Sequence, residues 1–363
     1  MTGRTAERLP VVVLTGFLGS GKTTLLSRML ASPDFADSAV IINELGDVGI
    51  DQDLVRMTSE TVMVMPGGCV CCSIRGDVER ALQRLFDDRD AGRIPPFRRL
   101  VIETTGIADP QPLLVTLRVN PLAASRLAPA MVVTVVDGIL GRDTLATEVE
   151  AASQVAAADA IVVSKRDLGQ DEALMPVLGD LNPWAGRRSA NLLADPLGAI
   201  LDGECRAGAF LGHFACQPST ISSSRHGDIR SHCLVLDEAL DWTAFGVWMS
   251  MLLHRHGRNI LRVKGLLNIE GASGPVAFHS AQHVVHPPQH LTAWPGDDRR
   301  GRIVFIVRKI EPALIEQSLK LFDATAKVTG DGGGRGGYLP AAAGGSIAGR
   351  PVRRPTAPRW LKG

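Results

Sequence analysis

The residues from Gly16 to Thr24 have the types and the spacing of a loop that binds phosphate. They read Gly-Phe-Leu-Gly-Ser-Gly-Lys-Thr-Thr and fit the pattern G-x-x-x-x-G-K-[ST]. Glycines let such a loop curl until its backbone N–H groups point at an anion. We expect Lys22 to reach the β- and γ-phosphates of a nucleotide and the Thr23 hydroxyl to bind Mg²⁺. The predicted phosphate-binding residues are Gly16, Gly19, Ser20, Gly21, Lys22, Thr23 and Thr24.

Two residues at the end of a later apolar run are candidates for the reaction itself. The run at 99–103 ends in Glu103, and an acidic residue at the end of a strand commonly serves the Mg²⁺ of a phosphate-binding loop. Gly106 follows closely and is placed to donate its backbone N–H to the γ-phosphate, which would make its loop sensitive to the nucleotide. We therefore expect four residues to carry the chemistry: Lys22, Thr23, Glu103 and Gly106.

The stretch Ser164-Lys165-Arg166-Asp167 indicates a choice of base. The carboxylate of Asp167 can accept hydrogen bonds from both donors on one edge of guanine. Adenine lacks this donor pair, so it would leave a buried carboxylate unpaired. Lys165 is expected to lay its stem along the base. Asp137 also ends an apolar run, but the sequence assigns it no role.

Three cysteines lie within four residues, at Cys69, Cys71 and Cys72, directly after two glycines. Thiolates suit metals such as Zn²⁺ and Co²⁺, and a fourth ligand would complete a tetrahedron. Glu44 or Asp47, in an acidic loop after another apolar run, is the candidate for that ligand. Two other interpretations remain open, namely cysteines that only pack in the interior and a thiol redox relay.

Short apolar strands must position these motifs. We expect strands at 11–14, 39–43, 61–65, 99–103, 131–136 and 160–164, and helices at 25–30, 77–88 and 147–158. This alternation predicts an α/β fold in which a mostly parallel sheet carries helices on both faces. Every motif follows a strand, and ligands of such sheets bind beyond the carboxyl ends of the strands.

A second pattern begins after residue 229. Residues 1–195 are predicted to form the nucleotide-binding domain, and residues 196–229 a linker, because Gly, Ser, Cys and His are scattered there without period. Further elements predict a smaller α+β domain over 230–322, with strands at 233–236, 260–267, 281–285 and 302–307 and helices at 242–253 and 312–321. Residues 323–363 are rich in Gly, Ala, Pro and Arg and are expected to stay disordered.

Composition limits the class of protein. The chain has 363 residues, of which 45% are apolar and 21% charged, and its net charge is +1. A folded core is therefore expected, and nothing indicates a nucleic-acid or membrane surface. No signal peptide is visible, and no apolar run reaches the roughly 18 residues of a membrane span. We therefore expect a cytoplasmic protein. In that reducing compartment, clustered cysteines bind metal more often than they form disulfides.

Taken together and in order, the motifs resemble those of the CobW family of P-loop GTPases, metallochaperones related to the nickel-maturation GTPases of hydrogenase and urease. The resemblance covers about residues 10–322. It rests on the segments 16–24, Asn43-Glu-Leu-Gly46, Gly67-Gly-Cys-Val-Cys-Cys72, Glu103-Thr-Thr-Gly106, 164–167, Leu261-Arg-Val-Lys-Gly-Leu266 and 302–306.

The resemblance implies a P-loop NTPase fold, a CobW-like C-terminal domain, and GTP hydrolysis coupled to the handling of Zn²⁺ or Co²⁺. It implies the following roles: phosphate binding by Gly19 to Thr24, Mg²⁺ binding by Thr23 and Glu103, guanine selection by Lys165 and Asp167, and metal binding by Cys69, Cys71 and Cys72. Three features depart from the family pattern. Ser164 stands where Asn or Thr is usual, Asp47 stands where Glu is common, and the long His-rich loop between the domains is nearly absent.

The leading hypothesis is a GTPase that passes a metal to a client. GTP and Mg²⁺ would order the loops that flank the cysteines, and hydrolysis would release the metal to a client metalloprotein or a metal-insertion enzyme, in cobalamin synthesis or in zinc homeostasis. The alternative is a nucleotide-dependent binding switch whose cysteines are structural or redox-active. The expected partners are GTP or GDP, a transition metal ion, the client and a second copy of the chain, with no nucleic acid and no membrane.

Overall fold

The structure is a computed structural model of the whole chain. It describes residues 8–43, 62–65, 74–169, 171–195, 197, 229–282, 284–285, 287–294 and 296–330. The chain divides into two compact units, Met1–Asp323 and Ala324–Gly363. The first unit contains two β-sheets and carries all of the sites discussed below.

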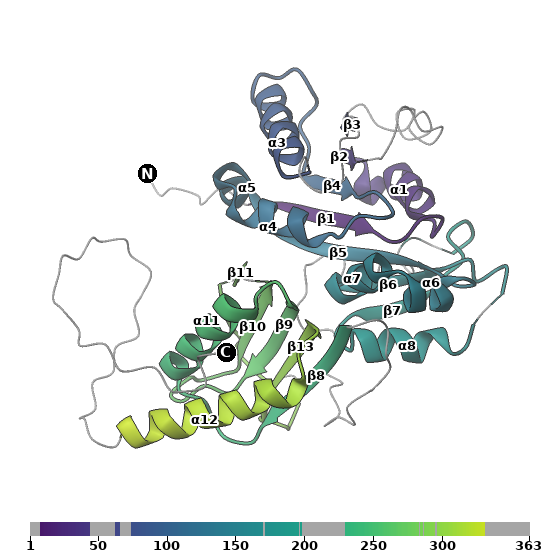
Figure 1. Ribbon diagram of the computed structural model, residues 1–363. Coiled ribbons are helices and arrows are strands. Elements are labelled where there is room, and N and C mark those ends of the chain that lie inside the picture. The colour runs from purple at the N-terminus through teal and green to yellow at the C-terminus, as the bar shows by residue number, and fades with distance from the viewer. Residues whose placement is uncertain are drawn as a thin grey trace. The chain divides into compact units, whose positions relative to one another are not determined.

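The first sheet has seven strands, and every pairing in it is parallel. The predicted α/β class is confirmed (Figure 1). In spatial order the strands are β3 (Val62–Met65), β2 (Ser38–Asn43), β4 (Arg99–Glu103), β1 (Leu9–Thr15), β5 (Leu127–Asp137), β6 (Ala160–Ser164) and β7 (Gly186–Ser189). The helices that connect them are α1 (Lys22–Ala31), η1 (Pro33–Phe35), α3 (Ile74–Asp90), α4 (Gln111–Val119), α5 (Pro121–Arg126), α6 (Gly141–Thr147), α7 (Val149–Ala157) and α8 (Leu174–Leu181).

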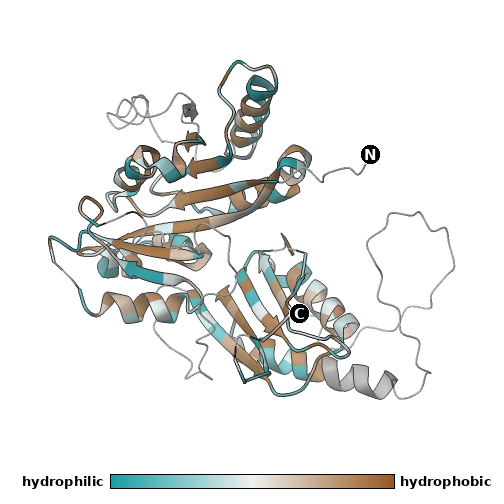
Figure 2. Ribbon diagram, turned by 180° about the vertical axis from the view of Figure 1, so that it is seen from behind, coloured by the Kyte–Doolittle hydropathy of each residue, from teal (hydrophilic) through white to brown (hydrophobic). Residues whose placement is uncertain are grey.

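Both faces of this sheet are covered by helices, which explains why its central strands are mostly apolar rather than alternating between apolar and polar residues. Because side chains alternate across a strand, Val11 and Val13 of β1 pack with α3 and α4, whereas Val12 and Leu14 pack with α1. Figure 2 shows the resulting hydrophobic strands. The strands are therefore fixed rigidly, and their carboxyl ends form one edge from which the motifs emerge.

The second sheet is antiparallel. Its strands lie in the order β11 (Val284–Val285), β10 (Val276–Ala281), β9 (Ile260–Leu267), β13 (Gly301–Arg308) and β8 (Ile229–Leu236), and β12 (Gln289–His290) also pairs with β10. Helices α11 (Trp242–His256) and α12 (Pro312–Gly330) accompany it. Phe245, Trp248 and Phe305 are buried in its core, which agrees with the predicted amphipathic helix and α+β class.

Several element boundaries differ from the sequence prediction. The single strand expected at 281–285 is wrong, because β10 ends at Ala281 and β11 folds back against it with Ala281 opposite Val284. Gln282 makes this turn with a positive φ of 49°. Helix α12 continues to Gly330, past the predicted end at residue 321. Of the tail expected to be disordered, residues 331–363 lie outside the described residues, as does most of the predicted linker.

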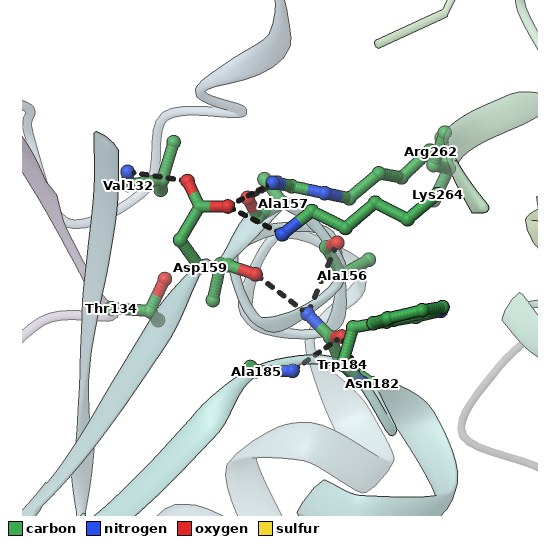
Figure 3. Close-up of polar contacts among 12 residues, drawn as sticks. Val132, Thr134, Ala156, Ala157, Asp159, Asn182, Trp184, Ala185, Arg262 and Lys264 are labelled. Carbon is green, nitrogen blue, oxygen red and sulfur yellow. Dashed lines mark hydrogen bonds and ion pairs between the residues drawn. The ribbon is translucent and has the colours of Figure 1, made fainter. Parts of the chain in front are cut away.

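The two sheets are joined by a buried ionic cluster around Asp159, at the start of β6 (Figure 3). Lys264 Nζ lies 2.7 Å from Asp159 Oδ1, and the Arg262 guanidinium binds the same oxygen and the carbonyl of Ala157. Val132 N donates to Asp159 Oδ2 at 2.9 Å. Burial alone would raise the pKa of Asp159, but the two cations and the hydrogen bonds hold this pKa well below its ordinary range. Asp159 is therefore an ionised anchor between the sheets.

Candidate functional site

The predicted phosphate loop leaves β1 and ends in the first turn of α1. Gly16 has φ 144°, and a Cβ there would lie 2.2 Å from the carbonyl oxygen of Val135, so only glycine fits this position. Gly19 and Gly21 also have positive φ, 70° and 97°. Gly21 caps α1, so the N-terminus of that helix faces the loop. The loop therefore has the curled shape that an anion site needs.

Lys22, Thr23 and Glu103 meet beside this loop. Lys22 Nζ donates to the carbonyl of Phe17 at 3.1 Å, so its side chain arches over the loop. Thr23 Oγ1 donates to Glu103 Oε1 at 3.0 Å, and Glu103 is only 3% exposed. A hydroxyl and a carboxylate held together are the oxygen ligands that Mg²⁺ prefers.

Two other loop hydroxyls differ in their surroundings. Ser20 Oγ is buried and has no hydrogen-bond partner among the described residues. Thr24 is exposed on the first turn of α1. A buried hydroxyl with an unused donor suits a phosphate oxygen, so Ser20 fits the predicted site more directly than Thr24 does.

The turn that follows Glu103 packs directly on the phosphate loop. A Cβ on Gly106 would lie 2.8 Å from Leu18 N, so the two backbones are in close contact. Thr104 N donates to Leu14 O at 2.9 Å, and the Thr104 hydroxyl donates to Thr15 at 2.8 Å. The structure thus brings Gly106, as predicted from the sequence, beside the loop that would hold the phosphates.

A second cluster lies at the ends of β5 and β6. Lys165 Nζ lies 2.5 Å from Asp137 Oδ2, and Asp137 Oδ1 accepts from Ile139 N and Leu140 N. Burial raises the pKa of Asp137, but the hydrogen bonds from Lys165, Leu140 and Ile139 outweigh it, so the net pKa of this carboxyl is lowered. Asp137 is thus a residue of this cluster for which the sequence suggested no role.

Asp167 and Ser164 lie on either side of Lys165 in the sequence but have different surroundings. Asp167 is exposed, and no described residue forms an ion pair or a hydrogen bond with its carboxylate. Ser164 is fully buried, and its hydroxyl donates to the carbonyl of Ser20 at 2.7 Å. The serine that departs from the family pattern therefore still ties the predicted base site to the phosphate loop.

Replacing Asp137 with Asn is expected to weaken nucleotide binding about tenfold, by the same factor for GTP and for GDP. Asn keeps the acceptor for the two backbone N–H groups but loses the charge that holds Lys165, and a charge-assisted hydrogen bond contributes roughly 1.5–3 kcal/mol. Fluorescence titration with labelled GTP and GDP measures both affinities. Asp171→Asn, which breaks the Arg142–Asp171 pair (2.8 Å), is the control. A loss confined to GTP would contradict a role of this pair at the base.

The loop at 190–195 completes the site, although no motif in the sequence predicts it. It follows β7, a short strand with the mostly polar sequence Gly-Arg-Arg-Ser that gives no apolar pattern. The side chain of Leu192 lies against Gly21, and Arg28 of α1 donates to the carbonyls of Leu192 and Asp195. Arg166 forms an ion pair with Asp195 at 2.9 Å. The loop therefore braces the phosphate loop and the predicted base site together.

The predicted metal ligands belong to segments outside the described part of the chain. Cys69, Cys71, Cys72, Glu44 and Asp47 all lie outside the described residues. Within the described ranges no group of three or more His, Cys, Asp or Glu side chains could hold a metal ion. In the same part of the chain, no helix combines the length and the apolar character needed to cross a membrane.

Comparisons with known proteins agree with this arrangement. The family profile described as "CobW/HypB/UreG, nucleotide-binding domain" matches residues 10–183, and that of the "Cobalamin synthesis protein cobW C-terminal domain" matches residues 229–322. The chain is 32% identical over 306 residues to the zinc chaperone YjiA of Escherichia coli K12, which covers 82% of this chain and 93% of that protein. It is 36% identical over 183 residues to the zinc-regulated GTPase metalloprotein activator 1 of Schizosaccharomyces pombe, covering 48% of this chain and 43% of that protein.

A solved structure resembles the fold. The crystal structure of the Zn(II)-bound YjiA GTPase from E. coli superimposes with a TM-score of 0.68 at 25% sequence identity, covering 87% of this chain and 99% of that one. The two family profiles and the long alignment with YjiA indicate the same family. The phosphate loop and the motifs at the sheet edge agree with this assignment. The chain belongs to the CobW family of metallochaperone P-loop GTPases.

Proposed function

We propose that this protein hydrolyses GTP at the phosphate loop and uses the nucleotide to control a zinc ion held by Cys69, Cys71 and Cys72. The loop residues Gly16 and Gly19 to Thr24 bind phosphate, Lys22 neutralises it, and Gly106 senses the γ-phosphate. Lys165 and Asp167 select guanine. The metal is cargo for a client protein, in keeping with relatives named as zinc chaperones and as a metalloprotein activator.

The observation that carries this proposal is the register of three parallel strands. Asn43 at the end of β2 lies opposite Met65 at the end of β3, and Ile42 lies opposite Glu103 at the end of β4. Glu44 and Asp47 follow Asn43 in the sequence, and the cysteine motif follows Met65. The segments with the candidate metal ligands thus leave the sheet at the edge where Glu103 meets Thr23, which supports a coupling between nucleotide and metal.

The residues around Thr23 fit a magnesium ion. The Thr23 hydroxyl and the buried Glu103 carboxylate already share a hydrogen bond of 3.0 Å. In this proposal Thr23 binds Mg²⁺ directly and Glu103 serves it directly or through water. Held there by Thr23 and Glu103, Mg²⁺ would supply positive charge that offsets the negative charge of the phosphates. Lys22 supplies the neighbouring positive charge from the chain itself.

The base is selected at the other end of the loop. The exposed Asp167 carboxylate accepts from the two donors of guanine, and adenine would offer it none. Asp137 holds the Lys165 ammonium at 2.5 Å, so the lysine stem is fixed where a base would lie along it. Ser164 ties this end of the site to Ser20.

Metal titration in the two nucleotide states tests the proposal. Reduced protein is expected to bind Zn²⁺ and Co²⁺ more tightly with Mg²⁺ and a non-hydrolysable GTP analogue than with Mg²⁺ and GDP, by about tenfold or more, because coupling energies of 1–3 kcal/mol are typical. Bound Co²⁺ is followed by its thiolate charge-transfer absorption, and competition gives the Zn²⁺ affinity. The triple Cys69→Ser, Cys71→Ser, Cys72→Ser variant is expected to lose the absorption band.

The control for this experiment is Val70→Ala, which changes the residue between two of the cysteines, keeps all three thiols and should keep the band. Equal metal affinity in both nucleotide states would contradict the coupling, because a ligand shifts only an equilibrium whose states it binds differently. No thiolate band in either state would favour the alternative, a nucleotide-dependent switch with structural or redox-active cysteines.

A further inference from the structure

Gln154, on helix α7, makes two hydrogen bonds to the turn that follows Glu103. Its side-chain amide nitrogen donates to the carbonyl oxygens of Gly106 and of Ala108, both at 3.0 Å. Gln154 is only 1% exposed. Since both neighbours are acceptors, the NH₂ group of the amide must face them. The turn is therefore fixed by one buried side chain from another element.

The position of this turn determines where the Gly106 N–H lies. Gly106 already touches Leu18 of the phosphate loop, where a Cβ would come within 2.8 Å of Leu18 N. There is no room for the turn to move toward the loop, and on its other side the Gln154 amide holds its carbonyls. A displaced turn would carry the Gly106 N–H away from the γ-phosphate, and displacements of about 1 Å in a reacting geometry can cost 10²-fold in rate.

Helix α7 is itself held firmly. The Thr134 hydroxyl of β5 donates to the backbone carbonyl of Gln154 at 2.8 Å. Arg308 of β13 donates to the hydroxyl of Ser153, and Arg262 of β9 donates to the carbonyl of Ala157. The helix is thus braced by both sheets, and a group that must hold a reacting geometry is best placed on such a rigid element.

The turn reaches the antiparallel sheet directly as well. Gln111, just after the turn, donates from its side-chain amide to the carbonyl of Leu261 at 3.2 Å. Asp109 Oδ1 accepts from Gln111 N at 3.0 Å. Burial raises the pKa of Asp109, which the Gln111 hydrogen bond and the nearby Arg308 oppose. The segment from Gly106 to Gln111 is therefore anchored at both ends, by Gln154 at its start and by β9 at its end.

We propose that Gln154 is a positioning residue for GTP hydrolysis: it holds the turn so that the Gly106 N–H meets the γ-phosphate. This role rests on the function proposed above. Gln154 touches neither nucleotide nor metal and acts through the turn. It follows that Gln154 matters for the nucleotide that carries a γ-phosphate and not for GDP, which distinguishes positioning from a general contribution to stability.

Gln154→Met tests this role, because methionine has a similar length and shape but no donor. We expect the preference for a non-hydrolysable GTP analogue over GDP to fall about tenfold and kcat to fall at least tenfold, with GDP affinity unchanged. Asn182→Leu is the matched control. Asn182 is a fully buried amide that donates to the carbonyls of Val155 on the same helix and of its C-cap Ala158 but does not reach the turn. This variant should melt earlier and keep the preference.

Gln154→Glu gives an independent readout. A carboxyl buried against two carbonyls has a raised pKa. Only its protonated form can donate a hydrogen bond to the turn. The kcat of this variant, relative to wild type, is expected to rise as the pH falls from 8 to 6, whereas that of Gln154→Met stays flat.

Three results would overturn the inference: an unchanged GTP-over-GDP preference in Gln154→Met, an equal loss in Asn182→Leu, or parallel pH profiles of the two Gln154 variants. A wild-type protein that neither binds nor hydrolyses GTP would instead overturn the proposed function, and this inference with it. Wild-type hydrolysis combined with an unaffected Gln154→Met variant would leave the function standing and remove only the role of Gln154.

Discussion

Replacing Lys22 with alanine is expected to lower kcat for GTP hydrolysis by about a thousandfold while the protein stays folded. Lys22 lies in the first turn of α1, and its side chain arches over the loop. Its ammonium nitrogen lies 3.1 Å from the carbonyl oxygen of Phe17. Charge that develops on the phosphates meets this fixed positive group, and removing one preorganised group of this kind typically costs 10²–10³ in kcat. Alanine is an excellent helix residue, so α1 itself should not suffer.

Phosphate release under single-turnover conditions measures this effect, and the melting temperature of the free protein serves as the folding check. Lys320→Ala is the control, because Lys320 is an exposed lysine whose ammonium pairs with Glu316 one helical turn away. Hydrolysis within tenfold of wild type would mean that the loop does not use Lys22. A large fall in the melting temperature would show a structural effect instead.

Replacing Asp159 with alanine is expected to lower the free energy of unfolding by about 3–5 kcal/mol. The side chains of Arg262 and Lys264 converge on its carboxylate and are each only 12% exposed. Removing one member of a buried ionic group leaves the remaining charge uncompensated, and this loss is what costs about 3–5 kcal/mol. Without Asp159, the buried charges of Arg262 and Lys264 would lack their anionic partner between the sheets.

Urea unfolding followed by tryptophan fluorescence measures this change, with Trp184 and Trp248 reporting on the two sheets. Asp298→Ala is the matched control. Its carboxylate also accepts from two arginines, Arg300 and Arg302, but at the surface, and its loss should change the midpoint little. Adding Arg262→Leu and Lys264→Met to Asp159→Ala is expected to restore most of the stability. A triple variant as unstable as the single one would contradict the ionic explanation.

The same carboxylate sets a pH dependence. Because the pKa of Asp159 is lower in the folded protein than in the unfolded chain, its contribution is fully present above the ordinary pKa of about 4. It is lost as the pH falls through the folded-state value. Wild type should therefore lose stability in acid more steeply than Asp159→Ala does.

The sequence predicted the parts of this fold that depend on local patterns. Apolar runs such as 99–103 and 131–136 correspond to central strands because both of their faces are buried, and this leaves a continuous hydrophobic signal. The phosphate loop could also be predicted from its glycines, because positive φ and close contact restrict the residue type at Gly16. The sequence also places four residues at one edge of the sheet, because each belongs to a motif that follows a predicted parallel strand. They are Thr23, Glu103, Gly106 and Lys165.

Other features depend on contacts between distant residues and gave no local signal. The mostly polar edge strand β7 resembles a loop in its sequence, so the brace at 190–195 was missed. Asp137 and Gln154 acquire roles only from the partners that the fold brings to them. The hairpin at Gln282 was missed because the apolar residues on either side of the turn read as one run. The cysteine motif, the strongest chemical signal in the sequence, lies outside the described residues and stays a prediction.

The all-parallel order of the first sheet also governs how the protein is made. The partners of the phosphate loop lie far downstream, with Glu103 80 residues after Thr23 and Ser164 144 residues after Ser20. A nascent chain emerges at about 5–20 residues per second, so an incomplete chain holds the loop for roughly 7–29 s without the groups that shape it. A site that needs these groups is incomplete during this interval. The apolar strands made first must therefore be kept from aggregating by some other means until β6 has been synthesised.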